Sequence, residues 1–194
     1  MNYIKSDYAK YIRKMDHKDY SFIDPPWLLD DSPPKVMGQL DYLLWHDNSL
    51  LLPLLGNIDT DVIFLWTIVA ILDEVFNLIS RQNRFVYKTK VEWVKLTKNK
   101  KIHFGTGHWF RNSTECLLVL AKPDIKPIRL QFRNVCFAES SKVKTKKPKK
   151  FERKIMNKLL DKKGCYIFCG NDVSKFRDFD IECIDILNKK EVIL

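Results

Sequence analysis

Several features that would point to a membrane or secreted protein are missing from this sequence. No run of its 194 residues reaches the ~18 consecutive apolar residues of a membrane span, and the N-terminus lacks the apolar core of a signal peptide. The five cysteines are an odd number, show no CxxC or Cys/His spacing, and lie mostly within apolar runs. This pattern indicates reduced, buried thiols in a cytosolic or nuclear protein.

The sequence signals of several enzyme classes are also missing. There is no P-loop, no Ser-His-Asp arrangement and no metal-ligating cluster, and the chain contains no internal repeat. What is present is an apolar content of 45%, which suits a single globular domain over residues 1–194. One low-complexity segment interrupts it, the basic stretch SSKVKTKKPKK at 140–150, which we expect to be a loop.

Charge is distributed unevenly along the chain. Residues 1–80 carry 6 Lys and Arg against 12 Asp and Glu, whereas residues 81–194 carry 28 against 12, which together give the net charge of +10. A basic half of this size favours binding to a polyanion such as nucleic acid. A lysine-rich surface that only interacts with solvent is the alternative.

The pattern of apolar residues predicts an α/β fold. Strands are predicted at 20–23, 61–69, 84–96, 114–122, 135–139, 165–170 and 179–187, most of them near-continuous apolar runs. Helices are predicted at 39–47, at 71–79, where apolar residues recur at helical spacing, and at 149–164. This alternation predicts a mostly parallel sheet with helices on both faces and ligands at the carboxyl ends of its strands. Asp24 follows one predicted strand and Gly170 ends another, so we expect them to face one crevice.

The corner Asp24-Pro25-Pro26-Trp27 carries unusual chemistry. Its two prolines allow no helix or central strand to continue, and the first of them keeps Asp24 extended. An exocyclic amine on a nucleobase is a poor nucleophile, because its lone pair is delocalised into the ring. The Asp24 carboxylate and the Pro25 carbonyl can accept the two N–H groups of such an amine, while Trp27 or the proline face stacks on the extruded base. A plain turn of Asp and Pro is the alternative.

The corner and the motifs that follow it resemble a known family. Asp24-Pro25-Pro26-Trp27 is followed by VIFLWT at 62–67, EWVKL at 92–96, GTGHWFRNSTECLLVLAKP at 105–123 and the pair Lys147-Pro148. This order, over about residues 4–170, is similar to that of the DPPW-type adenine-N6 methyltransferases, which include the catalytic subunit of the eukaryotic mRNA enzyme and the ciliate DNA enzymes. The resemblance implies a permuted, Rossmann-like class I fold that uses S-adenosylmethionine. The catalytic motif then comes early, and the cofactor-binding strand, 165–170, comes late.

The resemblance also implies roles for individual residues. Asp24 would contact the methionine part of the cofactor as well as the target amine. Asp7 and Tyr8 resemble the pair that meets the cofactor adenine, and Lys147 resembles a lysine near the cofactor carboxylate.

The sequence departs from the family after the late strand. There CGNDVSKF stands where the mRNA enzyme has an Arg and a His that help to hold the cofactor. Asn171 and Asp172 are the candidates for the ribose hydroxyls, since an acidic residue is the usual acceptor of that diol.

We therefore expect the chain to methylate adenine N6 in nucleic acid as the catalytic subunit of a complex. DNA is favoured over RNA for two reasons. The basic loop departs from the mRNA enzyme, and an amino-acid composition rich in Lys, Asn and Ile resembles that of proteins encoded by the AT-rich genomes of ciliates. An RNA methyltransferase is the runner-up, and a non-catalytic partner subunit that binds nucleic acid is the alternative of another class. The candidate nucleic-acid contacts are Lys142, Lys144, Lys146, Lys149 and Lys150.

The family also implies a heterodimer with a degenerate homologous subunit, through the GTGHW loop that carries His108. The 23 residues before Asp24 are expected to leave no room for a target-recognition domain, so further DNA-binding subunits are expected. A nuclear location is expected, or a cytoplasmic one in a prokaryote. Trp66 and Trp93 lie within apolar runs and are expected in the core.

Overall fold

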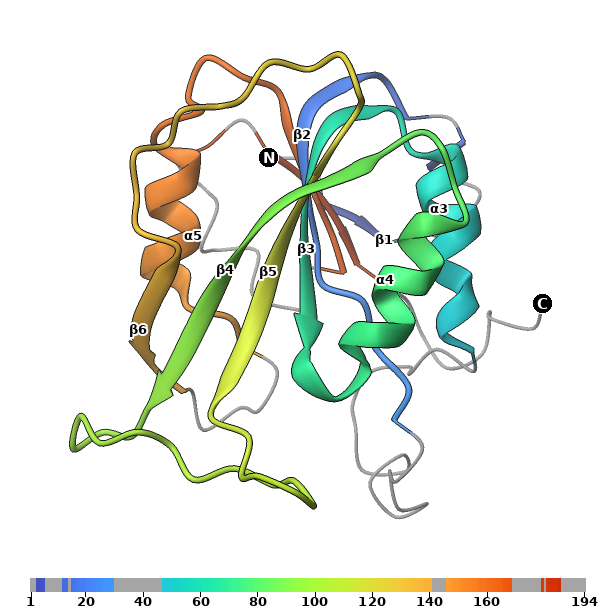
Figure 1. Ribbon diagram of the computed structural model, residues 1–194. Coiled ribbons are helices and arrows are strands. Elements are labelled where there is room, and N and C mark those ends of the chain that lie inside the picture. The colour runs from blue at the N-terminus through green and yellow to red at the C-terminus, as the bar shows by residue number, and fades with distance from the viewer. Residues whose placement is uncertain are drawn as a thin grey trace.

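An eight-stranded sheet forms the centre of the computed structural model, which describes residues 3–5, 12–13, 15–29, 47–140, 146–168, 179 and 181–185 (Figure 1). Within these ranges the strands are β1 (Tyr3–Lys5), β2 (Lys18–Ile23), β3 (Thr60–Ile68), β4 (Val86–Leu96), β5 (Thr114–Ala121), β6 (Val135–Glu139), β7 (Gly164–Ile167) and β8 (Ile181–Asp185). They lie side by side in the order β1-β8-β7-β2-β3-β5-β4-β6. Neighbours run parallel, except that β5 is antiparallel to both β3 and β4.

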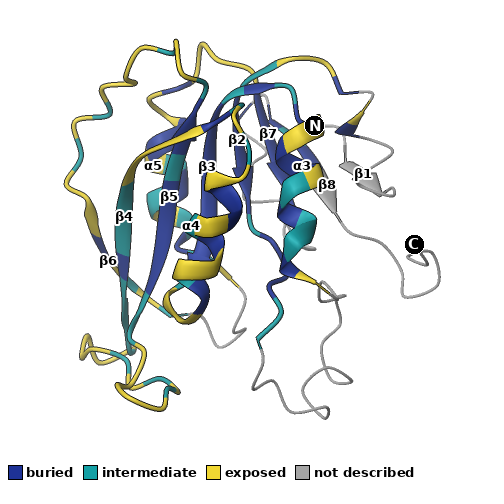
Figure 2. Cartoon of the chain, turned by 45° about the vertical axis from the view of Figure 1, so that its right-hand side comes forward, coloured by how far each residue is buried: buried dark blue, intermediate teal, exposed yellow. Residues whose placement is uncertain are grey.

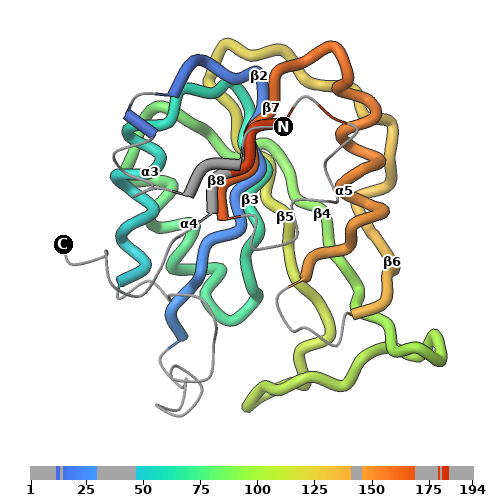
Figure 3. The backbone as a smooth tube through the Cα atoms, turned by 180° about the vertical axis from the view of Figure 1, so that it is seen from behind, coloured from blue at the N-terminus to red at the C-terminus, as the bar shows by residue number. Residues whose placement is uncertain are grey.

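Helices cover both faces of this sheet. The helices α3 (Leu51–Asn57) and α4 (Leu72–Ser80) lie on one face, each preceded by a 3-10 turn, η1 at Asn48–Leu50 and η2 at Val69–Ile71. Helix α5 (Lys149–Met156) lies on the other face, as the view from behind shows (Figure 3). No helix in the described part of the chain has the length and apolarity to cross a membrane. The predicted α/β fold with a mostly parallel sheet is confirmed, and the early strand β2 lies beside the late strand β7.

Successive residues of the central strands enter two separate apolar cores. Ile23 packs with residues of α3 and α4, whereas Phe22 packs on the face that α5 covers. The ring of Phe22 stacks between those of Phe64 and Tyr166, with centroid distances of 4.8 and 5.6 Å. Burial on both faces explains why these strands read as continuous apolar runs, and Figure 2 shows them as a buried band.

Most sequence predictions about the core are confirmed. Trp66 and Trp93 are 1% and 2% exposed, and both lie in the core on the α5 side. Each strand that was predicted is present with small differences in its ends. Four cysteines are described, and all of them are free and buried: Cys116, Cys136, Cys165 and Cys183.

Helix predictions were less accurate. The helix predicted at 149–164 ends at Met156, because the N–H groups of Lys158 and Leu159 bond three residues back and the chain continues in turns. Helix α3 was not predicted, because Pro53 interrupts its sequence. A proline is tolerated in a first helical turn, where the N–H has no acceptor within the helix. The strand β1 was also missed, while residues 39–46 and Gly170 lie outside the described residues.

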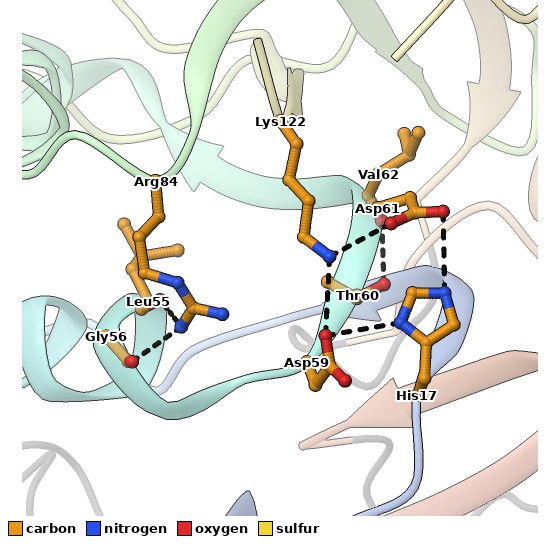
Figure 4. Close-up of polar contacts among 9 residues, drawn as sticks. All are labelled: His17, Leu55, Gly56, Asp59, Thr60, Asp61, Val62, Arg84 and Lys122. Carbon is orange, nitrogen blue, oxygen red and sulfur yellow. Dashed lines mark hydrogen bonds and ion pairs between the residues drawn. The ribbon is translucent and has the colours of Figure 1, made fainter. Parts of the chain in front are cut away.

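A cluster of polar contacts joins the amino ends of β2 and β3 to the carboxyl end of β5 (Figure 4). His17, which precedes β2, places Nδ1 3.2 Å from Asp59 Oδ1 and Nε2 3.4 Å from Asp61 Oδ2. Lys122, which follows β5, approaches the same two carboxylates at 3.3 and 3.0 Å. Nearby, the guanidinium group of Arg84 donates to backbone carbonyls at the end of α3. These contacts hold together the end of the sheet that lies opposite Asp24, where β2 and β3 begin.

Candidate active site

The carboxyl end of β2 forms a corner held by backbone hydrogen bonds. The N–H of Asp24 donates to the carbonyl of Ile167 in β7, with an N···O distance of 3.2 Å. The N–H of Trp27 donates to the carbonyl of Pro25 at 2.9 Å and closes a three-residue turn centred on Pro26. A proline suits the centre of such a turn because its φ is fixed and it has no N–H to leave unpaired. Asp24 is thereby fixed at the carboxyl edge of the two central parallel strands.

Trp27 anchors this corner to the neighbouring strand β3. Its indole N–H donates to the backbone carbonyl of Trp66 at 2.9 Å, and the residue is only 8% exposed. Pro25 and Pro26 are also buried. The expectation that Trp27 or the proline face stacks on an extruded base stays a prediction; in this arrangement both surfaces are buried. Through the contacts described above, these three residues hold Asp24 in place.

Asn48 fixes the chain as it leaves the corner. Its side-chain oxygen accepts from the Leu28 N–H at 2.9 Å, and its amide nitrogen donates to the Leu28 carbonyl at 3.0 Å. The same nitrogen donates to Glu74 Oε2 of α4 at 2.9 Å. Asn48 is 5% exposed, so the backbone of Leu28 is paired with a buried amide. Sequence reasoning missed this residue, because one asparagine at the start of NSLLLP indicates no more than a turn.

Four charged side chains of alternating sign extend from the corner. Lys147 Nζ lies 2.9 Å from Asp24 Oδ1 and 3.1 Å from Glu115 Oε2. The second oxygen of Glu115 pairs with Lys95. The side chains of Asp24, Lys147 and Glu115 are 16%, 11% and 7% exposed. The row Asp24–Lys147–Glu115–Lys95 is therefore mostly shielded from water and carries equal numbers of positive and negative charges.

Burial and these charges determine the protonation of the corner. Burial raises the pKa of Asp24 from 3.8 to about 6, although the ammonium group of Lys147 opposes the rise. Burial also raises the pKa of Glu115, but the ammonium groups of Lys147 and Lys95 outweigh it and leave that pKa below its ordinary value. Burial lowers the pKa of Lys147, but the carboxylates of Asp24 and Glu115 outweigh it and hold that pKa above its ordinary value. Near neutral pH, Asp24 is mostly ionised and is readily protonated.

Helix α5 is tied to the sheet, which positions Lys147 just before it. The carboxylate of Glu152 in α5 is fully buried and accepts from the Trp66 indole N–H at 3.0 Å. The same oxygen accepts from the Tyr166 hydroxyl at 2.8 Å. One carboxylate thus joins α5 to both β3 and β7, so Lys147 enters the corner from a rigid element.

The loop between β4 and β5 exposes large apolar side chains at the same edge of the sheet. Arg111 lies over the ring of Phe104, with 4.8 Å from its guanidinium carbon to the ring centroid. Monomeric soluble proteins rarely expose apolar groups in such a cluster, so the loop is a candidate interaction surface. Its most exposed members are Ile102, Phe104, Trp109 and Phe110, at 63%, 75%, 95% and 87%.

A comparison with protein families agrees with this geometry. The model of the MT-A70 family matches residues 19–170, a range that includes the corner, the charged row and strands β3 to β7. The chain belongs to the MT-A70 family. This is the family of DPPW-type N6-adenine methyltransferases, whose members use S-adenosylmethionine as the methyl donor. A comparison with curated proteins finds no match.

The corner of this MT-A70 protein fits the amino-acid end of S-adenosylmethionine. That end carries an ammonium and a carboxylate group, to which the charges of Asp24 and Lys147 are complementary. Both side chains are partly accessible, at 16% and 11%. Asp24 and Lys147 now pair with each other. If Asp24 paired with the ammonium group of the cofactor and Lys147 with its carboxylate, no buried charge would be left unpaired. In the described ranges, no cluster of His, Cys, Asp and Glu side chains is arranged to hold a metal ion.

The other predicted site residues of the MT-A70 chain fall into two groups. Lys149 and Lys150 form the first turn of α5, at the start of the predicted helix and the end of the predicted basic loop, and Lys146 lies three residues before Lys149. The helix begins there because Pro148 precedes it and the Phe151 N–H bonds back to the Pro148 carbonyl. Six predicted residues lie outside the described residues: Asp7, Tyr8, Lys142, Lys144, Asn171 and Asp172.

Three charged residues of this site were not singled out from the sequence. Glu115 had a signal, since an acid near the start of the apolar strand TECLLVLA requires a partner once it is buried. Lys95 and Glu152 had none, because charged residues are common in half-exposed strands and on helices. Their role depends on which strands and helices the fold brings together.

Proposed function

We propose that the chain transfers a methyl group from S-adenosylmethionine to the N6 amine of adenine in nucleic acid, with DNA favoured, as the catalytic subunit of a complex. The observation that carries the proposal is the Asp24 carboxylate, fixed at the exit of β2 and paired with Lys147 at 2.9 Å. Open α/β sheets bind their ligands at this edge. Family membership is the support for the methyl donor.

The chemistry required of Asp24 follows from the delocalised lone pair of the amine. S-adenosylmethionine, when bound, would supply a methyl group attached to a cationic sulfur. After transfer of the methyl group, this sulfur would remain as the neutral thioether of the product. Asp24 accepts one N–H of the amine and directs its lone pair toward the methyl carbon. The Pro25 carbonyl uses one lone pair for the Trp27 N–H and has a second for the other amine N–H. As the N–C bond forms, Asp24, with a pKa of about 6, accepts the proton that the amine releases.

A row of lysines on α5 supports the choice of a nucleic-acid substrate. Lys150, Lys154 and Lys158 are exposed and follow one another at intervals of four residues, so they line one side of the helix and the turn after it. Lys154 lies 4.3 Å from the ring centroid of Phe132 in the neighbouring segment. The row begins three residues after Lys147, so a bound strand that follows it would lead into the corner.

Phosphate contact by this row predicts a change in salt dependence. The double variant Lys154→Gln, Lys158→Gln should reduce the slope of log affinity against log salt by about 1.4 to 1.8, at ~0.7 to ~0.9 for each phosphate contact. The matched control is Arg81→Gln, Lys88→Gln, which removes two exposed charges at the end of α4 and the start of β4. Equal slopes in the two double variants would exclude α5 as the contact surface.

We also propose that the β4–β5 loop joins this chain to a homologous subunit. The support is the exposure of Trp109 and Phe110, at 95% and 87%, in a loop at the same end of the sheet as the candidate active site. The variant Trp109→Ser, Phe110→Ser should lose co-purification with that subunit while it keeps its own unfolding midpoint. An isolated chain that sediments as a monomer and is fully active would contradict this proposal.

The decisive experiment measures methyl transfer from labelled S-adenosylmethionine by the chain co-purified with its native partners. Matched adenine-containing DNA and RNA oligonucleotides are offered, and the products are digested to nucleosides. Asp24→Ala removes one of two amine acceptors and should lower the rate by roughly 10²-fold or more. Near-normal turnover in this variant would refute the role of Asp24.

The products separate the remaining possibilities. N6-methyldeoxyadenosine that disappears in Asp24→Ala supports the DNA enzyme, whereas N6-methyladenosine keeps the mechanism and identifies RNA as the substrate. No product on either, from folded protein that binds no S-adenosylmethionine, would indicate the non-catalytic partner subunit. A nuclear location goes with the eukaryotic form of this proposal and is tested by imaging the tagged chain.

A further inference from the structure

We propose that Lys95 is a positioning residue that couples the β4–β5 loop to Asp24 through Glu115 and Lys147. The inference rests on the proposed function in one respect, the catalytic role of Asp24. Its evidence is the place of Lys95 at the neck of the loop and the unbroken row of contacts from its side chain to the corner.

The backbone of Lys95 closes the neck of the loop. Its N–H donates to the Ser113 carbonyl at 2.8 Å, and its own carbonyl accepts from the His103 N–H at 2.8 Å. The Ser113 hydroxyl donates to the His103 carbonyl at 2.6 Å and completes the neck. The exposed aromatic residues Phe104, Trp109 and Phe110 all lie beyond this point. A partner that moves the loop therefore acts on the strand end that carries Lys95.

The side chain of Lys95 contacts the same carboxylate, that of Glu115 in β5, that pairs with Lys147. Lys95 pairs with one oxygen of Glu115, and Lys147 lies 3.1 Å from the other. The ammonium group of Lys95 also lies 5.2 Å from the ring centroid of Trp93, which is buried in the core. Glu115 thus has a separate cation on each oxygen, and the position of one cation affects how strongly it attracts the other.

Loss of the Lys95 charge changes the balance at the corner. Among the described residues, the charged groups that act on Asp24 are Lys147 before α5, Glu152 within α5 and Glu115 in β5. Without Lys95, the Glu115 carboxylate attracts the ammonium group of Lys147 more strongly. Lys147 is also the cation that is paired with Asp24. A carboxylate that loses part of its cation to another carboxylate takes up a proton at higher pH. A protonated Asp24 carries no negative charge to stabilise the developing positive charge on the amine, and it cannot take up the proton that the amine releases.

The experiment compares Lys95→Met with Lys95→Arg, which keeps the charge, and with Lys90→Met. Lys90 is the matched control, because it lies on the same strand and pairs with Glu92. The first readout is a ¹³C-NMR titration of aspartate side chains in the full chain, with Asp24 assigned by Asp24→Asn. Lys95→Met should move the Asp24 midpoint upward by about 0.5 pH unit or more. Lys95→Arg and Lys90→Met should leave it near that of the unmodified chain.

The second readout is the pH–rate profile of the complex. The methyl-transfer rate of Lys95→Met should fall by about threefold at pH 5, by about 1.5-fold at pH 6.5, and recover at pH 8.5, because its acid limb follows the Asp24 midpoint. An unchanged midpoint, or an equal loss at every pH, would overturn the coupling and leave Lys95 a structural residue. Lys95→Gln is the second variant if the methionine form does not fold. If no variant or parent transfers methyl groups, the proposed function fails, and the NMR titration still tests the coupling.

Discussion

Replacement of Asp24 by asparagine should stabilise the fold at neutral pH while it removes activity. Burial raises the pKa of Asp24 from 3.8 to about 6, so the folded state binds this proton more tightly than the unfolded chain does. The stability that the protonated group contributes is therefore full below pH ~4 and is lost as the pH rises through ~6. A difference of about 2 units, at about 1.36 kcal/mol for each, corresponds to about 3 kcal/mol of unfolding free energy.

The assay is urea unfolding of Asp24→Asn and of the unmodified chain between pH 4 and pH 8. The advantage of the variant should grow by about 2.5 kcal/mol between pH 4 and pH 7 and then level off, because about 0.5 kcal/mol has already been lost at pH 4. Asp161→Asn, which removes a carboxylate with a side chain that is 78% exposed, is the matched control for the loss of one negative charge. An advantage that is constant, or that shrinks with rising pH, would show that Lys147 fully compensates the burial of the ionised carboxylate.

Substitutions at three other positions test the site and the core. Lys147→Met should raise the pKa of Asp24 further above its ordinary value, since burial remains while the opposing ammonium is lost, and move the acid limb of the pH–rate profile upward. Glu152→Ala leaves two buried aromatic donors without their acceptor and should lower the free energy of unfolding in urea by about 3 kcal/mol, whereas Glu152→Gln keeps an acceptor and should cost less. Gly164→Ala places a Cβ 2.5 Å from the buried Tyr20 ring and should cost about 1–3 kcal/mol in the same assay. An unchanged unfolding midpoint in Glu152→Ala or Gly164→Ala would contradict the packing described above.

The sheet was largely predictable because its strands are buried on both faces. β3 and β5 read as the apolar runs VIFLWT and ECLLVLA, and β7 as CYI. The reversed direction of β5 was not predictable, because a local apolar pattern is the same in parallel and antiparallel strands. The extent of α5 was overestimated, since the turns at 157–163 keep apolar residues at helical spacing.

The candidate site was predictable only where its residues are adjacent in the chain. The Asp24 corner stands in four consecutive residues, and Lys147 was found through the resemblance. Glu115 and Lys95 reach the corner only through the pairing of β3 with β5 and of β5 with β4, which no short motif encodes. The burial of Trp27 was not predictable for a related reason. Its sequence indicates an aromatic ring at the corner, but the fold decides whether that ring faces a ligand or the core.

The antiparallel direction of β5 affects which part of this sequence can vary during evolution. A parallel strand at that place would be reached by a crossover connection, whereas a reversed strand is reached by a hairpin that opens at the edge where Asp24 lies. Hairpin loops tolerate insertions well, since doubling the length of a flexible loop costs only about 0.6 kcal/mol. The segment between Leu96 and Thr114 can therefore change in sequence and length to fit a new partner, while the sheet and the corner keep their structure.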